Sequence, residues 1–269
     1  MNEINQRQEA IECLMQQQTL LSEIRTFLKE IRDLERVMTR IGSASSNNPR
    51  ELQTLSKALQ QIPHLKKLLV DQGTQLEVAA EHLEAIPSLT DNIDNAIKDE
   101  VPLHLRDGGV IQDGYNATLD DLREAASNGR SWLATFQAEE AEQTGIKTLK
   151  VRFNKVFGYY IEISKSQLDK VPEHYQRKQT LTNVERYSVP ELTEYADRIL
   201  GAEERAVALE QELFQNLKKE TLQYLQTVQR NAQQIAYIDV VASLAERALT
   251  LDYVRPLMSE GTDIKVEEG

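Results

Sequence analysis

The sequence is poor in the residues that build strands and turns. Aromatic residues make up 6% of its 269 residues, and it has only 11 Gly and 7 Pro. Because aromatic residues favour strands and Gly and Pro mark turns, this scarcity predicts a mainly helical protein. The single cysteine, Cys13, excludes an internal disulfide, and one Cys with four scattered His is too few for a Cys/His zinc site.

Long apolar runs and excess positive charge are missing as well. No stretch of about 18 apolar residues occurs, so we expect no transmembrane helix. The 40% hydrophobic and 28% charged residues are typical of a folded chain rather than a disordered one. The 31 Lys and Arg stand against 43 Asp and Glu, a net charge of −12. Averaged over the chain, that balance argues against wholesale coating of nucleic acid or anionic membrane.

Apolar residues recur at three- and four-residue steps over most of the chain, as in amphipathic helices. Loops are expected at 43–49 and 107–114, where polar residues, Gly and Pro cluster. Two later stretches alternate steps of three and four, which is typical of the seam between paired helices. The first seam is Leu119, Leu122, Ala126, Gly129, Leu133 and Phe136, and the second is Leu192, Tyr195, Ile199, Ala202, Ala206, Leu209 and Leu213.

The period changes from helix to strand between the two seams. Segments 149–153 and 159–163 alternate apolar and polar residues, with Gly158 in the hairpin-length loop between them. We expect a third extended segment at 179–184. Periodicity alone is equally compatible with two helices of a bundle. The strand-like segment between the seams favours instead a small β-rich module inserted at the tip of a two-helix arm.

The charge is distributed unevenly. Residues 147–188 hold nine Lys and Arg against four Asp and Glu, a net charge of +5, so the remainder carries −17 (22 against 39). Lys150 and Arg152 share one face of the first strand, opposite its apolar face. A basic module on an acidic body is a footprint for a polyanion such as nucleic acid. The alternative is a solvated strand face with ordinary surface lysines.

Candidates for chemistry are weak elsewhere. Gly109 and Gly114 have the glycine spacing of a phosphate-binding loop, but Tyr115 and Asn116 follow where Lys and Ser or Thr are needed. We therefore interpret this segment as an ordinary loop. No Ser/His/Asp or Cys/His set can be assembled, so we expect no catalytic residue, no metal site and no enzyme activity in this chain.

Several longer segments carry a family resemblance. Residues 113–123 (DGYNATLDDLR) resemble the start of the descending lever helix of the MutS DNA mismatch-repair family. Residues 144–163 (TGIKTLKVRFNKVFGYYIEI) resemble the entry to that family's clamp domain, and 177–187 (RKQTLTNVERY) with 189–192 (VPEL) resemble its exit into the ascending lever. Residues 31–36 (IRDLER) are similar to the family's core segment. The resemblance covers nearly the whole chain. The segments that resemble the clamp favour the mismatch-repair branch of the family over its close relative that does not recognise mismatches.

The resemblance implies a mainly α fold: a helical core with a long antiparallel two-helix lever that carries a small β-rich clamp at its tip. The implied division is core 1–112, descending lever helix 113–146, clamp 147–188, ascending lever helix and return to the core 189–252, and the start of an ATPase domain at 253–269. The resemblance implies that the mismatch-binding and ATPase domains of the family lie outside the chain. It is therefore expected to be an excised fragment.

The resemblance also implies a function: a clamp that grips the DNA backbone without reading sequence, on a lever that couples DNA contact to the ATPase domain. This chain is then not an enzyme and holds no cofactor, whereas the full-length protein uses ATP and Mg. The implied partners are double-stranded DNA, a second copy in a homodimer and a protein of the MutL family, with no membrane. The implied location is the bacterial cytoplasm, associated with the nucleoid.

The resemblance implies site residues position by position. Backbone contacts of the clamp fall on Asn154, Gln179, Thr182 and Asn183, although some relatives carry a basic residue where Thr182 stands. Lys155, Arg177 and Lys178 give electrostatic support, beside the Lys150 and Arg152 identified from strand alternation. A function of another class stays open, namely a scaffold whose long helices transmit conformational change and bind protein partners.

Overall fold

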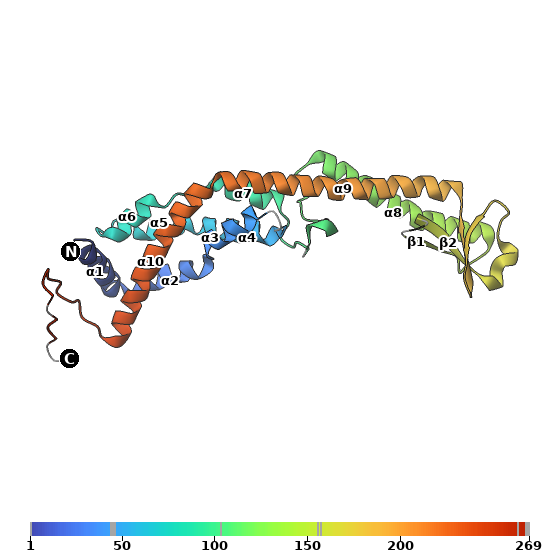
Figure 1. Ribbon diagram of the computed structural model, residues 1–269. Helices are drawn as coiled ribbons and strands as arrows, with labels where there is room; N and C mark the ends of the chain where they lie inside the picture. Colours follow the sequence, from blue (N-terminus) through green and yellow to red (C-terminus); the bar gives the residue numbers. More distant parts are fainter. Residues whose placement is uncertain are drawn as a thin grey trace. The chain divides into compact units, whose positions relative to one another are not determined.

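The computed structural model describes residues 2–43, 47–102, 104–154, 156, 158–262 and 264–266, without the side chain of Arg130. The fold is mainly α with one small antiparallel sheet, as the composition predicts (Figure 1). The chain divides into two compact units. Unit 1 comprises Met1–Leu105 and Phe214–Gly269, and unit 2 comprises Arg106–Leu213.

Unit 1 is built from helices. Its long helix α10 contacts α1, α2, α3 and α6, while α4 packs against α3, α5 and α7. Its apolar positions form a core in which Leu14, Ile24, Leu52 and Ile238 are fully buried. The helices are α1 (Asn2–Gln16), α2 (Gln18–Glu30), α3 (Leu34–Gly42), α4 (Pro49–Gln60), α5 (Ile62–Leu69), α6 (Gln75–His82), α7 (Pro87–Ala96) and α10 (Leu225–Leu251), with the 3₁₀ turn η1 (Leu105–Asp107) at the boundary with unit 2.

Polar side chains fix the ends of the helices in unit 1. Asn48 accepts a hydrogen bond from Arg50 N, with Pro49 in the first turn of α4, and Thr74 caps α6 in the same way. The fully buried Asn231 of α10 makes a pair of hydrogen bonds with the backbone N and O of Glu84, at 2.9 and 2.8 Å. The predicted loop at 43–49 lies between α3 and α4, and its residues 44–46 are outside the described part of the chain.

Two long helices frame unit 2. They are α8 (Ala117–Thr144) and α9 (Pro190–Gln223), and the residues of α9 up to Leu213 belong to this unit. They run antiparallel, because residue 123 meets residue 210, residue 129 meets residue 199 and residue 132 meets residue 195. Most residues of the two seams are buried, with Leu122, Tyr195, Leu209 and Leu213 half-buried. Trp132 stacks on Tyr195 at 3.7 Å between ring centroids.

The strands lie between these helices in the chain. They are β1 (Lys150–Asn154), β2 (Gly158–Ser164), β3 (Gln176–Thr180) and β4 (Val184–Ser188), and the 3₁₀ turn η2 (Lys165–Lys170) follows β2. All pairs are antiparallel in the order β1-β2-β4-β3. The first two predicted strands are confirmed. The single extended segment expected at 179–184 is wrong, because a two-residue turn at Thr182 and Asn183, closed by a 2.9 Å bond from Leu181 N to Val184 O, splits this region into two strands.

Candidate nucleic-acid interface

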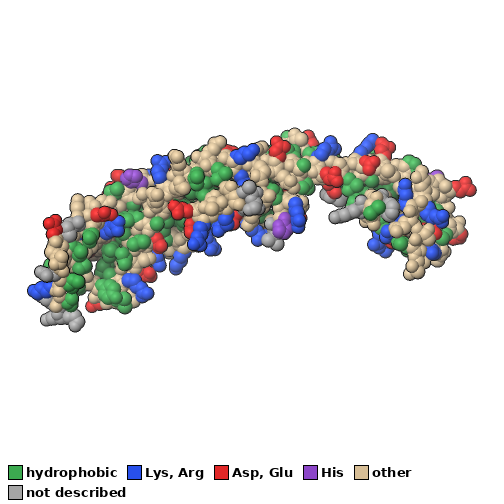
Figure 2. Space-filling model, in the orientation of Figure 1, with side chains coloured by type: hydrophobic (Ala, Val, Ile, Leu, Met, Phe, Trp, Pro, Cys, Tyr) green, Lys and Arg blue, Asp and Glu red, His purple; other side chains and the backbone are tan. Residues whose placement is uncertain are grey.

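The sheet has two chemically different faces, because side chains alternate along a strand. The apolar face carries Val151, Ile161, Ile163 and Tyr187, which join a core that includes Phe136 of α8. We call the opposite face the polar face. By strand register it holds Lys150, Arg152, Asn154, Tyr160, Glu162, Ser164, Gln176, Gln179, Arg186 and Ser188. Lys and Arg side chains, with some Asp and Glu, are visible over the strand-bearing end of unit 2 (Figure 2).

An ion-pair network crosses the polar face. Glu162 on β2 lies between two guanidinium groups, 3.3 Å from Arg152 Nε on β1 and 3.5 Å from Arg186 Nε on β4. Arg186 donates to Gln179 Oε1 at 2.8 Å, and its guanidinium lies 4.6 Å from the ring centroid of Tyr160. Planar guanidinium groups held over an aromatic ring are suited to bind phosphate oxygens. The site residues predicted from the sequence did not include Tyr160, Glu162 or Arg186, although the alternation in 159–163 sets the first two opposite the apolar side chains of their strand.

The predicted contact residues are spread over the sheet and its turns. The polar face brings together Lys150, Arg152, Asn154 and Gln179. Thr182 and Asn183 form the exposed β3–β4 turn, Lys178 lies at a bulge of the edge strand β3, and Lys155 is outside the described residues. Arg177 pairs with Tyr187 in the register, which places it with the opposite face.

The two turns lie at opposite ends of the sheet. Asn154 pairs with Gly158 at the first residue of β2, whereas Val184 pairs with Ser164 at its last residue. Seven residues of β2 separate these ends, roughly 20 Å of strand. That length corresponds to about six base pairs of duplex DNA, so the predicted set is spread over a length of several phosphates and is not gathered at one point.

Asn154 has a structural task within its own hairpin. Its side-chain Oδ1 accepts a 2.7 Å hydrogen bond from Val156 N, the arrangement of an Asx turn. The amide oxygen is therefore engaged in closing the β1–β2 turn. The NH₂ group of the same side chain has two donors, which are the groups that a phosphate accepts.

A buried carboxylate lies on the apolar side of the sheet. Glu185 accepts a 2.6 Å hydrogen bond from the Tyr187 hydroxyl, and Arg177 lies 3.8 Å away with 64% of its side chain exposed. Burial, followed by the hydrogen bond to Glu185, raises the pKa of Tyr187 to about 12. Tyr175 donates similarly to Glu140 of α8, and burial raises its pKa too. These pairs attach the sheet to its own core and to α8.

Raising the pH from 9 to 11 is expected to lower the free energy of unfolding of unit 2 by about 1 kcal/mol through Tyr187. The folded pKa of about 12 lies above the ordinary value of 10.0, so this contribution is complete below pH 10 and is lost as the pH rises toward 12. Urea denaturation at both pH values, followed by the fluorescence of Trp132, measures it. Tyr187→Phe should lose less stability over this interval, and an equal loss would contradict the assignment.

The glycine-rich loop binds a carboxylate of its own chain. Gly109 N and Val110 N donate to Glu210 of α9 at 3.1 and 2.8 Å, and Arg123 of α8 donates to the same carboxylate at 2.7 Å. Its amides are thus engaged by Glu210, so the segment does not fit the phosphates of ATP. Among the residues that the structure describes, no group of three or more His, Cys, Asp or Glu is placed to hold a metal ion such as Mg²⁺.

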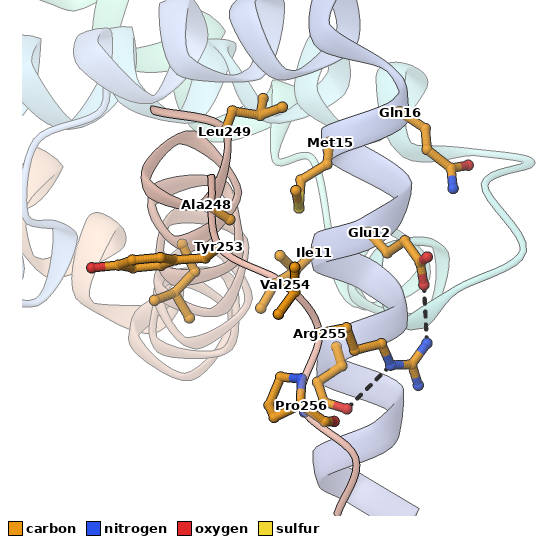
Figure 3. A pocket seen from close by; sticks show the side chains of 12 residues that line it. Ile11, Glu12, Met15, Gln16, Ala248, Leu249, Tyr253, Val254, Arg255 and Pro256 are labelled. Atoms are coloured by element: carbon orange, nitrogen blue, oxygen red, sulfur yellow. Dashed lines mark hydrogen bonds and ion pairs between the residues drawn. The ribbon is translucent and has the colours of Figure 1, made fainter. Parts of the chain in front are cut away.

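A groove of about 560 Å³ opens in unit 1 between α1, α10 and residues 253–256 (Figure 3). Apolar side chains such as Ile11, Met15 and Leu244 make up most of its lining. At its rim Arg255 pairs with Glu12 at 3.0 Å and donates to Gln8 Oε1 at 3.2 Å. This lining offers packing surface but no nucleophile or acid–base pair. Among the described helices, none combines the length and the apolar character that crossing a bilayer requires.

Fold and site together define a helical protein with a small basic antiparallel sheet between two long antiparallel helices. Residues 114–205, within unit 2, match the family model described as MutS family domain IV. The chain is 44% identical over 267 residues to the DNA mismatch repair protein MutS of Chlorobium chlorochromatii, covering 99% of this chain and 30% of that protein.

Further relatives extend the match. The protein of the same name from Lachnoclostridium phytofermentans is 41% identical over 270 residues, covering 100% of this chain and 29% of that protein. The one from Methanosarcina barkeri is 40% identical over 271 residues, covering 99% and 30%. The chain therefore belongs to the MutS family, and it spans about 30% of the length of these curated relatives.

Proposed function

We propose that this chain is the clamp-bearing part of a DNA mismatch-repair protein and that it holds the backbone of double-stranded DNA without reading sequence. The observation that carries this proposal is the polar face, where Lys150, Arg152 and Arg186 surround a single acid, Glu162. Lys and Arg side chains on a sheet can contact phosphates and position a protein on the duplex without contacting the base edges that carry the sequence. The net charge of +5 over residues 147–188, within an acidic chain, concentrates this attraction on the module.

The contact surface that we propose follows the sheet from one turn to the other. Asn154 forms its first end, Lys150, Arg152 and Gln179 its middle, and Thr182 with Asn183 its other end. We also propose Lys155, the residue after Asn154 in the sequence, as a contact residue. Lys178 on the edge strand and the half-buried side chain of Arg186 add positive charge beside this contact surface. Arg177 contributes at longer range, since its guanidinium pairs with Glu185.

We further propose that α8 and α9 act as the lever of a longer protein, coupling DNA contact to an ATPase domain that uses ATP and Mg. The stack of Trp132 on Tyr195 and the close approach at Gly129 support a stiff arm within unit 2. The family resemblance adds a homodimer partner and a MutL-family partner to this proposal, and a cytoplasmic, nucleoid-associated location. The name of the relatives supports the mismatch-repair part of this proposal.

Replacing Lys150 and Arg152 together by alanine is expected to weaken binding of the chain to a fluorescent duplex. Because the change removes two phosphate contacts, the slope of log affinity against log salt should fall by about 2. Anisotropy titrations at 25 to 150 mM salt, with two duplexes of unrelated sequence, measure both affinity and sequence dependence.

Lys147→Ala with Lys170→Ala is the matched control for this variant. It removes the same charge from the same module, at two exposed residues that are not part of the proposed contact surface. The control should bind almost as the wild type does. If both double variants lose equal affinity, the contact surface is wrongly assigned, and a strong preference for one duplex would exclude a sequence-independent clamp.

A further inference from the structure

Glu162 has an unusual position on the polar face. It is directly opposite Lys150 on β1 and Arg186 on β4, and its carboxylate also lies 3.3 Å from Arg152 Nε. Among the described residues assigned to this face it is the only acid. Its side chain is 17% exposed, so it is set into the surface among the cations instead of extending away from them.

The two arginines around Glu162 are held to different degrees. Arg186 is 19% exposed and is fixed by Gln179 and by the ring of Tyr160 as well as by Glu162. Arg152 is 52% exposed, and its guanidinium is turned to Glu162. An ion pair with one partner so exposed contributes little to stability, so a phosphate can displace the carboxylate at small cost.

We propose that Glu162 sets the affinity of the polar face by competing with DNA phosphate for Arg152. The proposal rests on the proposed function, since it concerns the same surface. While paired, Glu162 subtracts one charge from the face and occupies a donor of Arg152. When a phosphate arrives, the like charge of the carboxylate repels it, and the pair must open. Glu162 therefore acts through Arg152. It keeps the contacts between the polar face and the DNA backbone weak and easily released.

Glu162→Gln is the direct test, because it keeps the shape of the side chain and removes its charge. In the 269-residue chain, its association constant for a fluorescent duplex at 50 mM salt should rise roughly threefold to tenfold, because Arg152 no longer has to leave a carboxylate to contact a phosphate. Asp169→Asn is the matched control, since it removes an exposed acid from η2 of the same module. It should change affinity by less than about twofold.

A double-mutant cycle separates competition from general charge. In an Arg152→Ala background the gain from Glu162→Gln should shrink by at least about half, because Arg152, for which Glu162 and the phosphate compete, is absent. Unchanged fluorescence of Trp132 shows that each variant is folded. Equal or weaker binding by Glu162→Gln overturns the inference, as does an equal gain from Asp169→Asn.

The test also distinguishes the inference from the proposed function. If the wild type binds and loses affinity in the Lys150 and Arg152 double variant, yet Glu162→Gln brings no gain, only the role of Glu162 fails. If neither the wild type nor Glu162→Gln binds duplex at 25 mM salt, the proposed function and the inference fail together.

Discussion

Replacing Glu210 by alanine is expected to destabilise unit 2 by about 3–5 kcal/mol. Its carboxylate is 3% exposed and accepts hydrogen bonds from Arg123, Gly109 and Val110. Alanine would leave two amides without their acceptor and would remove one of the partners of Arg123, whose guanidinium, 22% exposed, would keep Asp113 and the Ile111 carbonyl. The bonds join α8, α9 and the loop before α8, so their loss should loosen all three. Urea denaturation followed by Trp132 fluorescence measures the change in the free energy of unfolding.

The same helix provides the control. Glu212→Ala removes an exposed acid two residues away, and it should change the free energy of unfolding by no more than about 0.5 kcal/mol. Glu210→Gln should fall between the two, because glutamine retains one acceptor oxygen but has no charge to pair with Arg123. A loss below about 1 kcal/mol for Glu210→Ala would show that the loop and Arg123 find other partners.

Glu210 also shows where the sequence stops predicting the fold. Steps of three and four correctly identified α8, α9 and most of their buried seam, because a helical stripe must repeat with the helical turn. The expected seam continued from Ala206 to Leu209, which is half-buried, whereas the neighbouring Glu210 is buried. An acid enters the core here only because Arg123 and the loop amides meet it. Such partners lie far away in the sequence, so no local pattern reveals them.

The β-module shows the same limit. Period-two alternation was sufficient to predict β1 and β2 and to place Lys150 and Arg152 on one face. It failed at 179–184, because the turn there contains neither Gly nor Pro and is held by a backbone bond from Leu181. The face of Arg177 could not be assigned either, since the register shifts between Arg177 and Gln179 and simple alternation no longer applies.

Gly129→Ala is expected to destabilise unit 2 by about 2–3 kcal/mol, although alanine is normally the better helix former. A Cβ at this position of α8 would lie 2.1 Å from Cγ1 and 2.7 Å from Cδ1 of Ile199 on α9. Ile199 is 2% exposed and packed in the core, so it has little room to move. The two helices would have to separate, which should also disturb the stack of Trp132 on Tyr195. Urea denaturation and the emission spectrum of Trp132 report both effects.

Gly201→Ala is the matched control, since it lies inside α9 with nothing within 4 Å of the added Cβ. That variant should gain up to about 1 kcal/mol from helix propensity alone. In an Ile199→Ala background the atoms that cause the clash are absent, so Gly129→Ala should then cost little or even stabilise. A coupling of about 2 kcal/mol between positions 129 and 199 would assign the effect to close contact of the helices. Equal losses in both backgrounds would mean that α8 needs glycine for a reason other than the approach of Ile199.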